Sequence, residues 1–270
     1  MSHPNQNNID KLVEEVIKRP KYQHIMLDLI LYVGKQELGK RDSYKSALKE
    51  TLTRLHQVGG AYLNQKINYS DWLIQFSNLA SPSDSEFKKT CLRMMQLHAS
   101  TKERVPIIEN LFSESLSQIG PIHSVMDLAC GLNPLSIPWM PLVEDCVYYA
   151  CDIFTDMVDF VNGFINLSKL KGEAFCCNLA ESIPAHKVQL ALLLKTMPCL
   201  EQLDKRIIPQ ILEKINADHL LVSYPVYSIS GKQKGMMSTY KNHFAQLIMD
   251  SKWHSQEFVF KSELVYLLSK

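Results

Sequence analysis

The sequence predicts an α/β protein in which an all-helical N-terminal domain precedes a mostly parallel, doubly wound sheet that ends in an antiparallel hairpin. Through about the first hundred residues the apolar side chains recur with helical spacing, and no stretch alternates convincingly with the period of two that strands show. From residue 122 onward, short apolar runs alternate with helical segments, which indicates a parallel sheet covered on both faces. We therefore expect a helical domain over residues 1–104 and an α/β domain over residues 105–270.

The front half is predicted to consist of helices joined by short breaks. Apolar faces indicate helices over residues 9–19, 22–38, 42–65 and 69–79, and Pro20 separates the first two. Ser83 with Glu86, and Ser100 with Glu103, have the spacing of capping boxes, in which the two residues satisfy backbone N–H groups at a helix start. The second pair predicts a helix over residues 101–118.

The back half is predicted to alternate strands with helices. Strands are expected over residues 122–128, 147–152, 174–179, 188–195, 220–224, 258–260 and 263–268. Helices are expected over residues 155–170, with Thr155 as the cap, 203–216 and 235–250. Five parallel strands followed by a hairpin are typical of the class I (Rossmann-like) S-adenosylmethionine-dependent methyltransferase sheet, whereas dehydrogenase-type sheets usually continue in parallel.

Composition excludes several classes of protein. The 270 residues are 46% hydrophobic, enough to bury a full core, and no apolar run reaches the length of a membrane span. The N-terminus lacks the cationic and apolar pattern of a signal peptide, so we expect a cytoplasmic protein without a membrane partner. The seven cysteines show no C-x-x-C spacing and the nine histidines no zinc-helix spacing, so no metal is predicted.

Charge is unevenly distributed along the chain. Residues 1–104 hold 16 Lys and Arg against 11 Asp and Glu, whereas the remainder holds 13 against 17. A basic front half suggests contact with a polyanion, although such a balance is also common on solvated helices.

The loop after the first predicted strand contains one glycine. A dinucleotide-binding loop carries three, which let the backbone close on a pyrophosphate. Here Gly131 stands alone, and Asp152 follows it by 21 residues at the end of the second predicted strand. A carboxylate there can accept hydrogen bonds from ribose hydroxyls, and ribose without pyrophosphate indicates S-adenosylmethionine. The alternative for Asp152 is a cap for the helix that follows it.

Six segments then carry a resemblance to a known family: "LHQVGGAYL" (55–63), "LHASTKERVPIIENLF" (97–112), "DLACGLNPL" (127–135), "LLLKTMPCLEQLD" (192–204), "SYPVYSISGKQKGM" (223–236) and "ELVYLL" (263–268). In this order and at these distances they closely resemble the aminoglycoside-resistance 16S ribosomal RNA (guanine-N7) methyltransferase family. The resemblance covers nearly the whole chain. It implies a helical domain that docks on the small ribosomal subunit and a domain that methylates a guanine of the decoding site.

The resemblance also assigns a cofactor-binding set. It implies that Arg104 meets the carboxylate of S-adenosylmethionine, although Arg104 could instead pair with a carboxylate on its own helix. The other implied cofactor contacts are Tyr62, Ala129, Gly131, Asp152, Ile153, Asn178, Leu179 and Leu194. Two residues depart from the family pattern: Ala129 stands where the loop often has glycine, and Asn178 where many members have aspartate.

Guanine N7 carries a lone pair and no proton, so its methylation requires no general base, and alignment should supply the rate. Glu263, at the head of the last strand, is the candidate to stabilise the cationic product; otherwise it is a surface strand residue. Lys195, at the end of an apolar strand, is the second catalytic candidate, and a surface lysine is the alternative.

The target base must be flipped out of its helix to expose N7. Candidate RNA contacts are Lys18, Arg19, Lys21, Arg54, Tyr227, Lys232 and Lys234, although loop lysines can also be merely solvated.

Two other functions remain open at this stage. An inactive relative that binds ribosomes as an assembly factor would explain the departures at Ala129 and Asn178. A small-molecule methyltransferase would not need the basic helical front half and should keep its activity once residues 1–100 are removed. Nothing in the sequence demands a dimer, so we expect a monomer.

Overall fold

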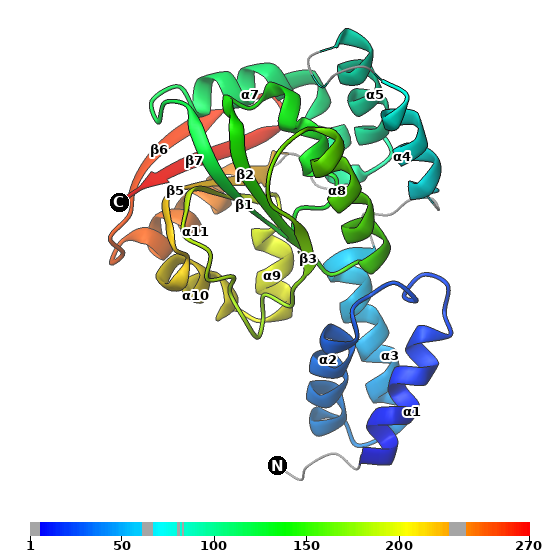
Figure 1. The fold of residues 1–270 in the computed structure, drawn as a ribbon. Coiled ribbons are helices and arrows are strands. Elements are labelled where there is room, and N and C mark those ends of the chain that lie inside the picture. Colours follow the sequence, from blue (N-terminus) through cyan, green and yellow to red (C-terminus); the bar gives the residue numbers. More distant parts are fainter. Residues whose placement is uncertain (1–5, 61–66, 80–81, 83, 227–235) are drawn as a thin grey trace.

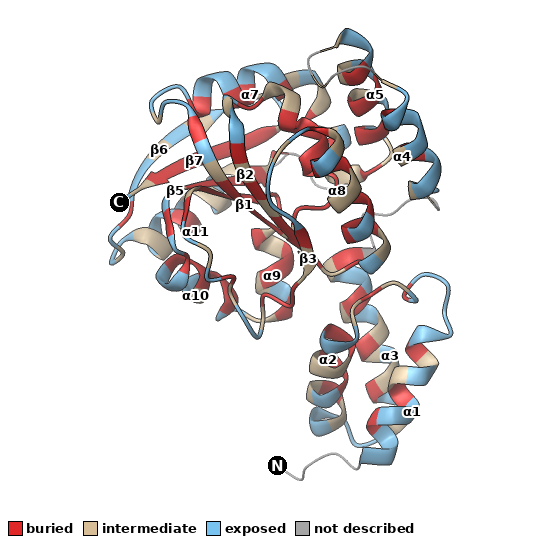
Figure 2. Cartoon of the chain, viewed as in Figure 1, coloured by how far each residue is buried: buried red, intermediate tan, exposed pale blue. Residues whose placement is uncertain are grey.

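The computed structural model describes residues 6–60, 67–79, 82, 84–226 and 236–270. A three-helix bundle projects from a larger α/β body, and the carboxyl-terminal part of the third helix reaches toward that body (Figure 1). Buried residues concentrate along the central strands and on the inward faces of the helices (Figure 2). None of the helices in these ranges combines the length and apolar character that a membrane crossing requires.

The bundle contains α1 (Gln6–Ile17), α2 (Leu27–Lys40) and α3 (Tyr44–Leu55), and α3 continues into a π-helical turn, η1 (His56–Gly60). Its core consists of apolar residues spaced three or four apart, such as Leu12, Val16 and Val33, all fully buried. Ser43 starts α3 by accepting a hydrogen bond from the backbone N–H of Ser46. The helical spacing in the sequence therefore corresponds to a real amphipathic bundle.

The next two helices, α4 (Tyr69–Ser77) and α5 (Ser85–Met95), pack against the α/β body, α4 on α8 and α5 on η3. The ring of Phe164 lies 4.9 Å from that of Phe76 and 5.7 Å from that of Phe87, which ties both helices to α8. Front-half helices are thus divided between the bundle and the body. Asp84 caps α5 by accepting from the N–H of Glu86, and Ser83, the expected cap, lies outside the described residues.

Seven strands form one sheet in the order β3-β2-β1-β4-β5-β7-β6. Their bounds are β1 Ile122–Leu128, β2 Leu142–Asp152, β3 Ala174–Cys176, β4 Val188–Leu194, β5 Ala217–Pro225, β6 His254–Val259 and β7 Glu263–Ser269. The first five pair in parallel, and β7 is antiparallel to both β5 and β6. The strand order reverses beside β1, so its carboxyl end and that of β4 flank the crevice where such sheets bind ligands.

The remaining helices connect these strands. They are α6 Ala99–Lys102, η2 Val105–Ile107, α7 Ile108–Ser115, η3 Asn133–Trp139, α8 Thr155–Leu167, α9 Met197–Leu203, α10 Ile207–Lys214 and α11 Met236–Ile248.

Three local predictions were wrong. The helix expected over 101–118 is divided among α6, η2 and α7, with Pro106 in η2, and His98 occupies the N-cap position of α6. Phe154, and not Thr155, occupies the N-cap position of α8, and the Thr155 hydroxyl donates to the backbone oxygen of His24. The helix expected over 203–216 begins later, as α10 at Ile207, and a helix that was not predicted, α9, ends at Leu203.

Candidate active site

A pocket lies at the carboxyl ends of β1, β2 and β4, where the strand order reverses. Its lining includes all the described residues that we assigned to the cofactor from the sequence: Arg104, Ala129, Gly131, Asp152, Ile153, Asn178, Leu179 and Leu194. Lys195 also lines it, whereas Tyr62 lies outside the described residues. The sheet topology therefore brings together residues separated by up to 91 positions, from Arg104 to Lys195.

The backbone at this edge of the sheet is held in an uncommon conformation. Ala129, Gly131 and Lys195 have φ values of +48°, +53° and +60°, in the left-handed region that favours glycine. Non-glycine residues in this region cluster at functional sites, where the surrounding structure maintains the strain. Ala129 thus keeps a glycine-like conformation although it has a side chain.

Asp152 is fixed by the loops on either side of it. One carboxylate oxygen accepts from the N–H of Gly131 at 2.8 Å, and the other accepts from the N–H groups of Ile153 at 2.6 Å and Phe154 at 3.4 Å. Burial raises the pKa of Asp152, and these three N–H groups oppose that rise. A carboxylate offers about four acceptor positions, so capacity remains for a ligand hydroxyl. Asp152 therefore joins the loop after β1 to the segment before α8 and lines the pocket.

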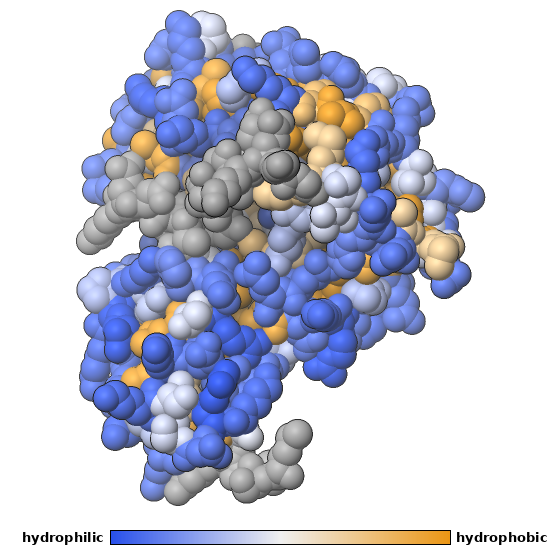
Figure 3. All heavy atoms as spheres, turned by 180° about the vertical axis from the view of Figure 1, so that it is seen from behind, coloured by the Kyte–Doolittle hydropathy of each residue, from blue (hydrophilic) through white to orange (hydrophobic). Residues whose placement is uncertain are grey.

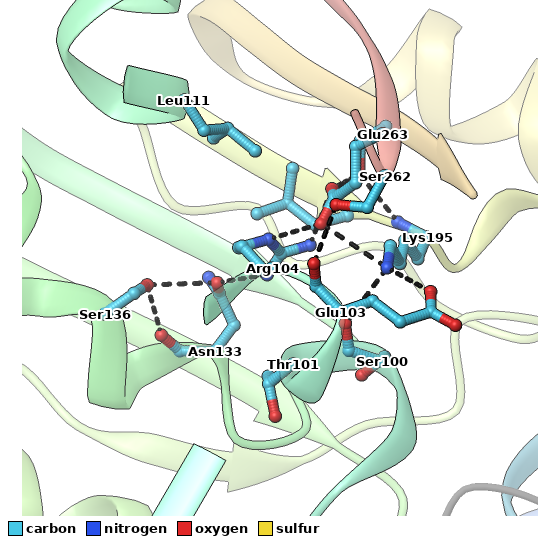
Figure 4. Close-up of polar contacts among 12 residues, drawn as sticks. Ser100, Thr101, Glu103, Arg104, Leu111, Asn133, Ser136, Lys195, Ser262 and Glu263 are labelled. Atoms are coloured by element: carbon cyan, nitrogen blue, oxygen red, sulfur yellow. Dashed lines mark hydrogen bonds and ion pairs between the residues drawn. The ribbon is translucent and has the colours of Figure 1, made fainter. Parts of the chain in front are cut away.

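Arg104 is the centre of a buried ionic cluster, drawn in Figure 4. Its Nε and Nη2 donate to the two carboxylate oxygens of Glu263 at 2.9 and 3.0 Å, and its Nη1 donates to Oδ1 of Asn133 at 2.7 Å. Only 1% of Arg104 is exposed. A guanidinium has five N–H donors, and these contacts use three of them. Arg104 is therefore fixed against the pocket floor with donor capacity left.

Lys195 joins the same cluster from the end of β4. Its Nζ lies 2.7 Å from a carboxylate oxygen of Glu103 and 3.5 Å from Oε1 of Glu263, and it donates to the backbone oxygen of Ser100 at 3.2 Å. The alternative that Lys195 is a surface lysine is excluded, because its side chain is buried.

Glu263 does not lie where we expected it, beside a target base. It is fully buried, is absent from the pocket lining, and has oxygens that already accept from Arg104 and from the hydroxyl of Ser223 at 2.7 Å. Burial alone would raise the pKa of Glu263, but the charges of Arg104 and Lys195 lower it overall. Glu263 is therefore the ionised counter-charge of two cations.

Further buried polar groups adjoin this cluster through Asn133. Asp127 accepts from Nδ2 of Asn133 and from the hydroxyl of Tyr148, both at 2.8 Å. Burial raises the pKa of Asp127 to about 6. Burial, with the charge of Arg104, lowers the pKa of His98 to about 4, so this pocket residue is neutral at pH 7.

One wall of the pocket comes from the helical bundle, through residues that were not among the predicted cofactor contacts. Leu29 of α2 and Val58 and Gly59 of η1 line it. A Cβ on Gly59 would lie 2.7 Å from the ring of Phe154, so the two segments are in close contact. Because the bundle completes the pocket, removing residues 1–100 is no clean test of a small-molecule enzyme.

The predicted RNA contacts fall into three groups. Lys18, Arg19 and Lys21 are exposed in the turn that follows α1. The bundle presents a mainly hydrophilic face in the rear view (Figure 3). Arg54 does not fit the prediction of an exposed RNA contact. It donates to Gln36, Glu37 and the backbone oxygen of Leu203, so it is not part of an open basic surface. Tyr227, Lys232 and Lys234 lie outside the described residues.

Comparisons with known proteins agree with this geometry. A family model described as "Ribosomal RNA methyltransferase (FmrO)" matches residues 18–267. A 16S rRNA (guanine(1405)-N(7))-methyltransferase from Micromonospora rosea is 29% identical over 267 residues, which cover 98% of this chain and 97% of the relative. The protein of the same name from Serratia marcescens is 28% identical over 266 residues, covering 97% of this chain and 99% of the relative.

Solved structures show the same fold. The 16S rRNA methyltransferase RmtF in complex with S-adenosyl-L-homocysteine superposes with a TM-score of 0.79 at 24% identity, covering 98% of this chain and 99% of that one. The 16S rRNA methylase RmtB also gives 0.79, at 23% identity, covering 97% and 98%. Since the family match extends over most of the sequence, the chain belongs to the ribosomal RNA methyltransferase (FmrO) family.

Proposed function

We propose that this protein transfers a methyl group from S-adenosylmethionine to N7 of a guanine in the decoding site of 16S ribosomal RNA, and so confers aminoglycoside resistance. The guanine is the one numbered 1405 in the names of the curated relatives. One observation carries the proposal. In a member of a ribosomal RNA methyltransferase family, the carboxylate of Asp152 and the guanidinium of Arg104 line one pocket at the reversal of the sheet.

The residues of the pocket fit S-adenosylmethionine. Asp152 offers acceptors for ribose hydroxyls, and Arg104 retains donors for the carboxylate of the amino-acid part. Ile153, Leu179 and Leu194 supply apolar surface for the adenine side. Asn178 lies beside them, with its amide oxygen accepting from Ala180 N–H and its amide nitrogen donating to Glu181. Ala129 and Gly131 would lie beneath the methionine part, and Tyr62 remains a candidate over the site.

Bound S-adenosylmethionine supplies an electrophilic methyl group. Because guanine N7 already carries the attacking lone pair, the chain needs no general base, and its residues act by orientation and by exclusion of water. Lys195 and Glu263 belong to the rigid floor rather than to a proton-transfer pair. The imidazole of His98, neutral at pH 7, would add no positive charge to the pocket that would hold the cationic methyl donor.

The bundle is proposed as the main docking element for the small ribosomal subunit. Its exposed cations Lys18, Arg19 and Lys21 would contact phosphates without reading bases. Tyr227, Lys232 and Lys234 are proposed to hold the displaced RNA near the pocket. The protein is proposed to act as a cytoplasmic monomer that needs no metal.

Methyl transfer to purified small subunits tests the proposal. We expect labelled S-adenosylmethionine to label one guanine of 16S RNA, whose position reverse-transcription mapping identifies. Asp152→Ala should abolish most of the labelling, whereas the exposed control Glu144→Gln should not. Subunit binding without labelling of the RNA would favour an inactive assembly factor. Label on a small molecule alone would favour a small-molecule methyltransferase.

A further inference from the structure

The bundle touches the α/β body at residues that themselves line the pocket. Met26 N–H donates to the backbone oxygen of Ile153 at 2.8 Å, where residues 24–26 run antiparallel to the segment after β2. Gly59 packs against Phe154 and Ile153. Arg54 donates through Nη2 to the backbone oxygen of Leu203, the last residue of α9. Ile153, Phe154 and Leu203 all line the pocket, so the bundle's position and the pocket's shape depend on each other.

Arg54 makes a charged side-chain link among these junctions, and the hydroxyl of Tyr32 on α2 also donates to Oδ2 of Asp204 at 3.1 Å, directly after α9. The Nη1 of Arg54 donates to Oε1 of Gln36 at 2.9 Å and to Oε1 of Glu37 at 2.8 Å, both on α2. Its side chain is only 14% exposed, and that of Glu37 only 3%. The last carbonyl groups of a helix lack partners within it and attract cations. One guanidinium therefore bonds α2 and the open end of α9 at once.

We propose that Arg54 is a positioning residue that couples occupancy of the methyl-donor pocket to the orientation of the bundle, so that the occupied enzyme holds the small subunit more tightly. This inference rests on the proposed function and adds to it. A ligand against Leu200 and Leu203 fixes the end of α9, and Arg54 transmits that constraint to α2 and α3. By linkage, subunit binding then tightens ligand binding by the same factor.

Arg41 provides a matched control. It also bonds Glu37, with Nε 3.2 Å from Oε2, but its side chain is 42% exposed and both residues belong to the α2 region. Replacing Arg41 thus removes one ion pair of Glu37 without touching the link to α9.

The test measures the affinity of the full-length protein for purified small subunits, at one fixed salt concentration, with and without saturating S-adenosylhomocysteine. For the wild type and Arg41→Ala we expect the ligand to tighten subunit binding by about tenfold. For Arg54→Ala we expect a change of less than about twofold, because the ligand no longer fixes the bundle.

The outcomes separate the two proposals. Failure of the wild type to bind subunits would contradict the docking function itself. Subunit and ligand binding without mutual effect, or coupling that survives in Arg54→Ala, would overturn the inference alone. If Arg54→Ala does not fold, hydrogen exchange of the wild type provides the test. We then expect the ligand to slow amide exchange in α1, although no residue of α1 lines the pocket. Unchanged exchange in α1 would refute the coupling.

Discussion

The floor and the bundle-side wall of the pocket are built differently. The floor consists of the ends of β1, β2 and β4, with a buried ionic cluster below it, and hydrogen bonds of one continuous sheet fix its geometry. The wall consists of Leu29, Val58 and Gly59, which belong to a separate bundle. The difference teaches that charged groups can be buried where the sheet fixes their distances, whereas the bundle contributes apolar residues to the wall and bonds the body beside it through Arg54 and Tyr32.

The largest effect should come from breaking the floor. Arg104→Met leaves Glu263 buried without its two-point partner, so the free energy of unfolding should fall by about 3–5 kcal/mol, as measured by urea denaturation. The double variant Arg104→Met with Glu263→Leu should recover part of this loss, because it removes the unpaired charge. A loss below about 1 kcal/mol in the single variant would mean that the cluster does not stabilise the floor.

Two buried groups near the floor should also make the stability of the protein depend on pH. The pKa of Asp127 is raised from 3.8 to about 6 in the folded state, so its contribution to stability falls as pH rises from about 4 to 6. The pKa of His98 is lowered from 6.5 to about 4, so its contribution rises with pH over about 4 to 6.5. The two effects oppose each other in the wild type.

Single variants should therefore separate them. Relative to wild type, the stability of Asp127→Asn should increase with pH between about 4 and 6, and that of His98→Gln should decrease, each by up to about 3 kcal/mol. Denaturation at several pH values measures both differences. Parallel profiles for all three proteins would contradict the assigned pKa directions.

Ligand binding tests the floor more directly. Asp152→Ala removes the acceptors that we assign to ribose, so affinity for S-adenosylhomocysteine should fall by about 1–3 kcal/mol in calorimetry. Glu144→Ala, on the exposed part of β2, serves as the control. An unchanged dissociation constant for Asp152→Ala would refute the ribose assignment.

The wall predicts a smaller effect with a sharp internal control. Gly59→Ala forces a methyl group against Phe154 and should cost about 1–3 kcal/mol of stability, with weaker ligand binding. Gly39→Ala, where nothing lies within 4 Å, should instead gain up to about 1 kcal/mol through helix propensity. Equal stability changes at both positions would mean that Gly59 is not in close contact with the pocket residue Phe154.

The smallest effect concerns backbone strain. Ala129→Gly should stabilise the protein by about 0.5–1 kcal/mol, because glycine adopts a φ of +48° without a steric penalty. Lys169→Gly, at a φ of +59° outside the pocket, should stabilise it similarly but leave ligand affinity unchanged. Destabilisation in both variants would show that the left-handed backbone is not strained.

The same division explains what the sequence could predict. Apolar runs that end in Asp127, Asp152 and Lys195 indicate strand ends, and parallel strand ends meet at one edge, so the floor was predictable. The pairing of Arg104 with Glu263 was not, because it joins residues 159 positions apart that carry no shared pattern.

The wall was missed for a different reason. Leu29 and Val58 look like ordinary core residues of helices, and only the resemblance, through Tyr62, placed a residue of this part of the chain at the cofactor site. Ser100 with Glu103 was read as a capping box, yet the side chain of Glu103 bonds Lys195 across the fold. Local sequence patterns indicate helices and strands, whereas side-chain contacts between distant parts of the chain depend on how these elements pack.

The Gly59 contact also limits how such enzymes can be recombined. In a chimera that takes only residues 6–60 from a distant relative, different side chains would pack against Phe154 and Leu203. We expect such a chimera to bind the methyl donor weakly even with every strand-end residue intact. Exchanging α9 and the segment after β2 together with the bundle would preserve the fit. The bundle and the segments that it contacts on the body therefore have to be exchanged as one unit.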